Sequence, residues 1–310
     1  HSVVGGITAT PISRTTLNFS PTLRMSYKPQ RGTELRLDYF GRSFAPTNEQ
    51  LSPVQDVTNP LISYVGNQDL LPGFQHNLFG RFSKYWTKTQ TSLSVFGRAQ
   101  VVQNDIIQRS LYDVTTGKRT IDYTNVDGNA SVGIGGFLTQ TLPGKKFSIR
   151  VASFNDLARS NTYINGDKNR SLSLRLREEL GLNYRITGID MTLKGGFGYY
   201  NASNTLASAV TPPTKDYSLG YTTNITLPLG FAFEGEATYT TSRGYAAGYN
   251  QDQVLLNAGL SYSFLAGKKA TIRLKGYDLL NSRRSIYQSI TAMSSTIEES
   301  NTLGRYAMLH

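Results

Sequence analysis

The sequence predicts an all-β protein, an antiparallel up-and-down transmembrane β-barrel. The first observation behind this prediction is the pattern over residues 171–187. Every even position from Leu172 to Ile186 except Glu178 is apolar or aromatic, and every odd position is polar, charged or glycine. Successive side chains of a strand point to opposite faces, so this segment is one strand with an apolar and a polar face. Ordinary strands have about 5–6 residues. A longer strand is typical of a wall with lipid on one side and an aqueous or plug-filled interior on the other.

The second observation is that short and long links alternate along the chain. Short turns are expected at residues 28–32, 87–89, 142–145, 187–188, 228–230 and 266–268, and longer links at residues 43–72, 113–118, 158–169, 203–214, 243–250 and 280–300. Up-and-down barrels of the outer membrane have short periplasmic turns and long extracellular loops, whereas a soluble sandwich needs Greek-key crossovers. These links separate about thirteen strands, the last of which begins near Thr302.

The third observation is the composition. The 310 residues include 19 Tyr, 14 Phe and 29 Gly but no Cys, and only 38% of them are hydrophobic. No segment approaches the roughly 20 apolar residues of a membrane-spanning helix, and a barrel needs none because only alternate residues of its strands face lipid. The absence of Cys excludes disulfide bonds, thiolate metal sites and Cys nucleophiles.

Other alternating segments support strands throughout the chain, at residues 34–39, 92–95, 132–137, 147–151, 256–264 and 272–274. Aromatic residues stand beside the short turns, as an interfacial belt requires; they are Tyr27, Tyr85, Trp86, Tyr184, Tyr262 and Phe264. The strand at residues 171–187 then runs towards the periplasm. An apolar band of about 25 Å at a tilt of about 45° needs about ten residues, which places Glu178 near the outer edge of the band.

The net charge of +11 is compatible with a nucleic acid, an acidic lipid or an anionic ligand as partner. The basic residues are mostly single and alternate with apolar ones, and no run of five or more occurs. We therefore expect no nucleic-acid partner, and we place the basic residues on an interior wall or beside anionic lipid of the outer leaflet.

The sequence contains no convincing constellation for catalysis or metal binding. The three histidines His1, His76 and His310 lie far apart without the spacing of a zinc site, and no nucleophile elbow, phosphate-binding loop or dinucleotide fingerprint occurs. The Gly-rich residues 133–136 and 195–198 lie inside alternating strands, where glycine marks a bend, a bulge or the close approach of a plug. We therefore expect no enzymatic activity, no metal and no cofactor.

Three short motifs resemble the C-terminal barrel of TonB-dependent outer-membrane receptors, particularly those of the Bacteroidota outer-membrane β-barrel family. The motifs are residues 66–72 (GNQDLLP), 274–281 (LKGYDLLN) and 301–309 (NTLGRYAML). The first departs from the family pattern at Gln68, where the family has Pro, and at Gly73, where it has Glu. Because such receptors have 22 strands, the resemblance implies that residues 1–310 are a partial barrel domain with about the last 13 strands. A plug domain and the first strands are expected to precede it, and the final strand is expected to be truncated at His310.

The resemblance also implies a function, namely TonB-dependent active transport of a scarce solute across the outer membrane. The solute is expected to be a ferric siderophore or a molecule of the glycan or peptide class. The implied partners are outer-membrane lipid and lipopolysaccharide, the N-terminal plug domain of the same protein, the TonB complex through that plug, and a surface lipoprotein lid. A non-transporting structural or assembly barrel and a passive porin are alternatives, and a soluble β-sandwich or propeller is a further one.

The longer links supply the loop side of the expected binding site. Arg159, Lys168 and Arg170 are the candidate substrate-binding residues, because their positive charge favours an anionic ligand in an extracellular loop. Contact of the same cations with lipopolysaccharide phosphates is an alternative of equal weight.

Overall fold

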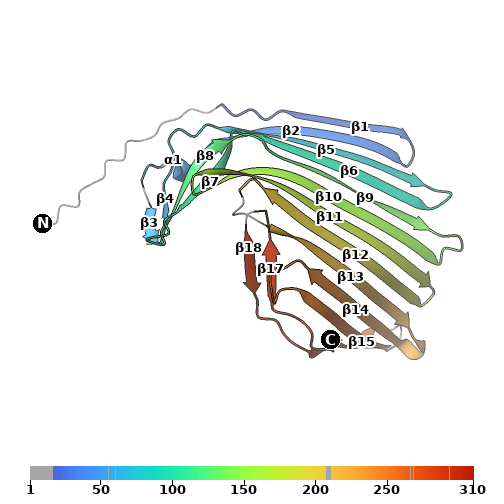
Figure 1. The fold of residues 1–310 in the computed structure, drawn as a ribbon. Helices are drawn as coiled ribbons and strands as arrows, with labels where there is room; N and C mark the ends of the chain where they lie inside the picture. The colour runs from blue at the N-terminus through green and yellow to red at the C-terminus, as the bar shows by residue number, and fades with distance from the viewer. Residues whose placement is uncertain are drawn as a thin grey trace.

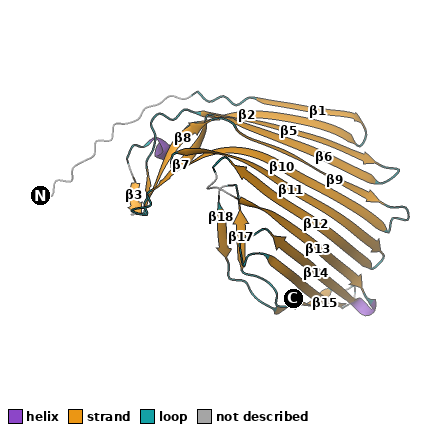
Figure 2. Ribbon diagram, in the orientation of Figure 1, coloured by secondary structure: helices purple, strands orange, loops and turns teal. Residues whose placement is uncertain are grey.

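The computed structural model is a curved sheet of long antiparallel strands, to which shorter strands and one short helix are added (Figures 1 and 2). It describes residues 17–54, 56–59, 61–206, 211–265, 267, 269–292 and 294–310. Of the expected features, His1, residues Ala266 and Lys268 of one short turn, and residues 55, 60, 207–210 and 293 of the long links lie outside these described residues.

Thirteen strands form a continuous meander in which each strand pairs antiparallel with the next. In spatial order they are β1 (Thr22–Gln30), β2 (Thr33–Phe44), β5 (Gly73–Trp86), β6 (Thr91–Gln103), β9 (Asn129–Thr141), β10 (Phe147–Ile164), β11 (Asp167–Ile186), β12 (Ile189–Asn204), β13 (Thr211–Thr226), β14 (Phe231–Arg243), β15 (Gln251–Phe264), β16 (Ala270–Tyr277) and β19 (Tyr306–Leu309). The expected number of strands and their up-and-down order are thereby confirmed. Within the described residues β1 and β19 do not pair, so the sheet is open (Figure 1).

Short elements extend the sheet at the end where the long links lie. They are helix α1 (Asn48–Leu51) and the strands β3 (Asp56–Asn59), β4 (Ile62–Tyr64), β7 (Asp105–Tyr112) and β8 (Arg119–Val126). Thr47 caps α1, because its Oγ1 accepts from Gln50 N at 3.3 Å while Gln50 Oε1 accepts from Thr47 N at 2.9 Å. Helix α1 was not expected from the sequence, because four residues are too few to show a helical period. Within the described residues, no helix is long and apolar enough to cross a membrane.

The expected alternation gives the sheet two faces. The face that we call the apolar face carries large hydrophobic side chains that remain exposed, among them Leu37, Val95, Leu180, Leu193 and Leu260. The opposite face, which we call the polar face, carries mainly charged side chains, hydroxyls and glycines. A barrel wall requires this division, because lipid covers one face and the interior the other.

Aromatic pairs lie on the apolar face beside the short turns. Phe147 and Tyr184 have ring centroids 4.7 Å apart, and Phe231 and Tyr262 have theirs 4.5 Å apart. Such rings are suited to a membrane interface. Of the six expected belt residues, only Tyr85 differs, because its register opposite Ser92 places it on the polar face.

The prediction of a loop at residues 158–169 is wrong, because most of these residues belong to two paired strands. β10 and β11 remain paired from Phe147 opposite Tyr184 up to Ile164 opposite Asp167, and a tight turn at Asn165 and Gly166, both at positive φ, joins them. Polar residues occupy both faces near this turn, so the sequence pattern there resembles that of a loop although the backbone is a hairpin.

Other long links also contain more strand than expected. Residues 113–118 form only the tip of the β7–β8 hairpin, and residues 280–300 contain the strands β17 (Ile286–Ile290) and β18 (Ser295–Glu299). In the link at residues 203–214, β12 continues to Asn204 and β13 begins at Thr211, while residues 207–210 lie outside the described part. The short turn at residues 228–230 is the 3₁₀ turn η1 (Pro228–Gly230).

Glu178 lies inside the apolar band rather than at its outer edge. Its Oε1 accepts a hydrogen bond from Ser153 Oγ at 2.9 Å. Exposed apolar side chains lie on both sides of it along the strands, Leu180 towards the short turns and Leu172 towards the long links. The hydroxyl of Ser153 therefore supplies a polar partner where lipid offers none.

Two glycines let charged side chains meet across an intervening strand. Arg98 on β6 and Asp156 on β10 form an ion pair at 2.5 Å over Gly133 of β9, and a Cβ at Gly133 would lie 2.8 Å from Arg98 Nε. Lys275 and Glu234 meet in the same way at 3.4 Å over Gly259. These glycines serve cross-strand contacts on the polar face rather than turns.

Candidate functional site

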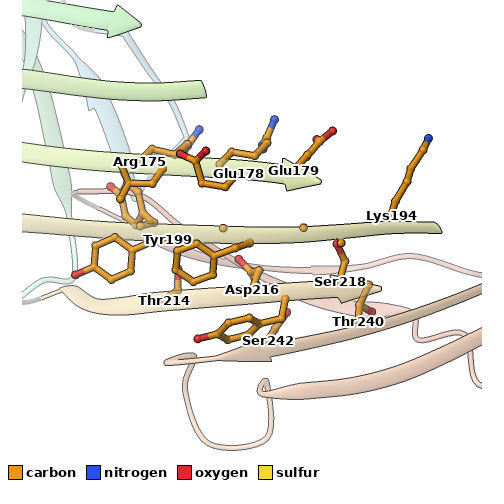
Figure 3. Close-up of a pocket in the computed structure, with 18 of the residues that line it drawn as sticks. Arg175, Glu178, Glu179, Lys194, Tyr199, Thr214, Asp216, Ser218, Thr240 and Ser242 are labelled. Atoms are coloured by element: carbon orange, nitrogen blue, oxygen red, sulfur yellow. The ribbon is translucent and has the colours of Figure 1, made fainter. Parts of the chain in front are cut away.

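A cavity of about 790 Å³ lies between the polar face of β11–β14 and the β17–β18 hairpin. Figure 3 shows its wall, with Arg175, Glu179 and Lys194 contributed by β11 and β12. Thr214, Asp216 and Ser218 of β13 and Thr240 and Ser242 of β14 continue it, and Gln288, Ser289 and Ile290 of β17 cover it. Its volume suits a small solute.

Basic residues slightly outnumber acidic ones in this cavity, because Arg150, Arg175, Arg177 and Lys194 line it together with Glu178, Glu179 and Asp216. Arg175, Arg177 and Lys194 line it, and within the described residues none of the three forms an ion pair. The guanidinium of Arg175 instead lies over the ring of Tyr200, 5.3 Å from its centroid. Cations that face a cavity without acidic partners are available to an anionic ligand.

Hydroxyl groups and the carboxylates of Glu178, Glu179 and Asp216 complete the polar lining. The Tyr245 hydroxyl donates to Asp216 at 3.2 Å, which joins the loop after β14 to the wall. Burial raises the pKa of Tyr245, and the nearby Asp216 carboxylate raises it further. Tyr245 is therefore a neutral hydrogen-bond donor at neutral pH.

Glycines on the polar face form part of the cavity wall. Gly196 and Gly198 line it, and a Cβ at Gly196 would lie 2.5 Å from Ser218 Oγ. The Gly-rich segment at residues 195–198 thus has a specific effect, because the missing side chain at Gly196 lets the Ser218 side chain lie close over the backbone of β12.

The β17–β18 hairpin is held over the cavity by hydrogen bonds to three parts of the wall. Gln288 Oε1 accepts from Ala246 N at 2.8 Å, and Ile286 O accepts from Gln251 Nε2 at 2.8 Å. At the hairpin tip, Ala292 O accepts from Asn204 Nδ2 at 3.0 Å. Bonds from two strands and one loop fix the position of the hairpin better than one contact would.

The residues that lead into the hairpin are held by Asp278, whose relative exposure is 1%. Its Oδ1 accepts from Ser282 N at 2.9 Å and its Oδ2 from Arg283 N at 3.0 Å. The hydrogen bond from Ser282 lowers the pKa of Asp278, and the bond and charge of Arg283 act in the same direction. Asp278 belongs to the sequence motif at residues 274–281, so the motif here forms the base of the cavity cover.

A buried polar network supports the outer end of β11 and β12. Asn169 and Ser171 have relative exposures of 0% and 1%. The amide of Asn169 donates to Asn204 Oδ1 at 2.9 Å, and its own Oδ1 accepts from Leu206 N at 3.1 Å. The network fixes Asn204, which in turn holds the tip of the hairpin.

The structure does not bring the sequence-predicted candidates into this cavity. Arg159 lies in β10, and Lys168 and Arg170 lie in β11. Their positions in the alternation place them on the apolar face, opposite to the cavity. These cations were expected at a binding site because of their position in a loop, but the loop here is a hairpin, and the alternation along the strands decides which face each side chain is on.

Arg175, Arg177 and Lys194 were missed as site residues although their signal was present. Arg175 and Arg177 occupy odd, polar positions of the alternating segment at residues 171–187, and parity alone assigns them to the interior. Within the described residues, no group of three potential metal ligands occurs. His76 contacts Tyr39 through Nδ1, 3.0 Å from the hydroxyl.

Comparison with known families gives a match over residues 7–309 to the outer membrane protein beta-barrel family. A comparison with curated proteins finds no match. The family match covers nearly the whole sequence and agrees with the meander of long strands, the apolar face and the polar face. The chain therefore belongs to the outer membrane protein beta-barrel family, and it is an outer-membrane protein.

Proposed function

We propose that the chain forms part of the wall of a TonB-dependent transporter that takes up a scarce solute across the outer membrane. The observation that carries the proposal is the covered cavity on the polar face. Arg175, Arg177 and Lys194 line it without an ion pair among the described residues, and it is large enough for a small solute. A wall with a structural role alone has no need of a covered, charged cavity.

In this proposal the solute enters from the outer side and binds Arg175, Arg177 and Lys194 through an anionic group, either a siderophore carboxylate or an acidic group of a glycan or peptide. The β17–β18 hairpin shields the solute from the exterior. A plug domain of the same protein lies against the polar face, and the TonB complex acts on the solute path through this plug. A surface lipoprotein is a further partner that covers the outer end.

The test is solute uptake in intact cells that carry the full-length gene or lack it. Cells are grown under iron limitation with ferric siderophores as the iron source, or on defined glycans or peptides as the sole carbon source. We expect that one class supports growth only with the gene and that dissipation of the proton gradient abolishes uptake. Uptake that persists without the gradient would establish a passive porin, and growth that never depends on the gene would support a structural barrel.

Two double variants locate the site. R177Q/K194Q removes two cations of the cavity and is expected to raise the half-saturating solute concentration about tenfold or more. R159Q/R170Q removes the same charge from the opposite face and is expected to leave uptake unchanged. Equal effects of the two variants would refute the cavity as the solute site. The absence of enzymatic activity stays a prediction.

A further inference from the structure

We propose that Arg159, Lys168 and Arg170, which we call the outer cationic patch, bind the phosphate groups of glycolipids in the outer leaflet. The proposal is independent of transport, because the patch lies on the face opposite to the solute cavity. It also assigns a role to three cations that the cavity does not use.

The first argument is that the three side chains share one face and one end of the wall. Arg159 is directly opposite Leu172 in the β10–β11 register, and Arg170 is opposite Asn161, two residues further along. Diagonal neighbours of this kind lie about 7–8 Å apart. Lys168 follows on the same face, so the cations form a short row towards the hairpin turn.

The second argument is the position of the patch relative to lipid. Leu157 and Leu172 are 45% and 46% exposed on the apolar face, and Arg159 and Arg170 each lie two residues beyond one of them. Two residues at about 3.3 Å each, on a strand tilted by about 45°, rise about 5 Å. The patch therefore lies where acyl chains give way to charged headgroups.

The third argument is that the charge of the patch is uncompensated. Among the described residues, no acidic side chain forms an ion pair with Arg159, Lys168 or Arg170. Arg243 on the same face provides the contrast, since its guanidinium pairs with Asp252 at 2.8 Å.

One side chain of the patch is also held in place. Arg159 Nε donates to Gly128 O at 2.7 Å, which fixes the guanidinium on the link between β8 and β9. Its terminal nitrogens then remain for a second partner. Arginine binds phosphate with two parallel hydrogen bonds, and a fixed guanidinium loses less entropy on binding.

A lipid phosphate fits this geometry better than a soluble phosphate. The exposed leucines next to the patch offer contact to acyl chains while the cations contact the headgroup, so one amphiphile satisfies both surfaces. Anionic headgroups contribute about 1 kcal/mol for each basic residue near the membrane surface.

The experiment uses the full-length protein purified from outer membranes in mild detergent. Native mass spectrometry measures retention of added phosphorylated outer-leaflet glycolipid, of the same glycolipid after removal of its phosphates, and of inorganic phosphate. We expect the wild type to retain the phosphorylated form and R159Q/K168Q/R170Q to retain at least about fivefold less. The matched control K88Q/K145Q/K146Q removes three exposed cations at the opposite end of the wall and is expected to retain the glycolipid like the wild type.

Equal retention by both triple variants would overturn the proposal, as would equal retention of the phosphate-free glycolipid by the wild type. Binding of inorganic phosphate without binding of the glycolipid would also overturn it, because the site would then serve a soluble anion. A shift in gel migration on heating checks that each variant is folded. A loss of glycolipid retention can then be distinguished from a loss of structure.

Discussion

The polar face has two regions that differ in whether their cations form ion pairs. Near the N-terminal end of the sheet, Arg24 and Arg36 both contact Asp38, at 2.7 and 2.5 Å. On β11 and β12, Arg177 and Lys194 line a cavity without ion pairs in the described part of the chain. The comparison indicates that paired cations hold neighbouring strands together, whereas unpaired cations remain available to a ligand.

The largest effect is expected from removing the base of the cavity cover. D278A deprives Ser282 N and Arg283 N of their acceptor, so the β17–β18 hairpin loses its fixed starting point. Because the residues that lead into the hairpin are no longer held, the hairpin covers the cavity less closely although its own bonds to the wall remain, and solute affinity is expected to fall about a hundredfold. Titration with solute measures the loss, and limited proteolysis at residues 282–300 should become faster. D278N keeps one of the two acceptor oxygens and should lie between the wild type and D278A; if it behaves like the wild type, neither the charge nor the second bond is needed to hold these residues.

The same carboxylate gives the cover a defined pH dependence. The pKa of Asp278 is lowered, first by the hydrogen bond from Ser282, so its contribution is fully present above the ordinary Asp value of about 4. The contribution is lost as the pH falls through the lowered pKa. Proteolysis of the hairpin should therefore be constant from pH 8 to 5 and increase only in stronger acid. An increase that begins near pH 6 would point to another titrating group.

A smaller effect is expected when one cation is removed from each region. R177Q should lower the affinity for an anionic solute about tenfold and leave unfolding in urea unchanged. R98Q breaks the ion pair with Asp156 and should do the opposite, lowering stability slightly and leaving affinity unchanged. Solute titration and urea unfolding in detergent are measured on both variants. If R98Q also lowers affinity, the division between paired and unpaired cations fails.

Gly133 permits the ion pair between Arg98 and Asp156. In G133A the new Cβ crowds Arg98 Nε and separates the ion pair over β9, which at this exposure costs about 0.2–1 kcal/mol. G195A is the matched control, because a Cβ there meets nothing within 4 Å. Urea unfolding should show G133A to be less stable than G195A. Equal stability would mean that the ion pair contributes nothing to the wall.

The sequence predicted the wall because its information is local. Alternation determines the face of each residue, and turn residues determine where the chain reverses. The face of Arg177 and the turn at residues 187–188 could therefore be predicted from a few neighbouring residues. Arg159 was assigned to the wrong face because it was expected in a loop. The alternation along its strand places it on the correct face.

The cavity was beyond such an analysis because its parts meet only in three dimensions. The contact of Gln288 with Ala246 joins residues 42 positions apart, and no periodicity connects them. The hairpin at residues 280–300 was expected as a link, but nothing in its composition indicates that it folds inward over β12–β14. Its anchor Asp278 was noticed only as part of a motif, without a structural role.

The smallest effect is expected at Asp216, an acid of the cavity wall that accepts from the Tyr245 hydroxyl. Y245F removes the donor to Asp216 and leaves a carboxylate that faces the solute more directly. An anionic solute should then bind about threefold more weakly, and a cationic or hydroxyl-rich solute should bind more tightly. Since the raised pKa keeps Tyr245 protonated, wild-type affinity should not vary through this group between pH 5 and 9. The sign of the change in Y245F thus tests whether the unpaired cations, and not Asp216, decide which solute the cavity accepts.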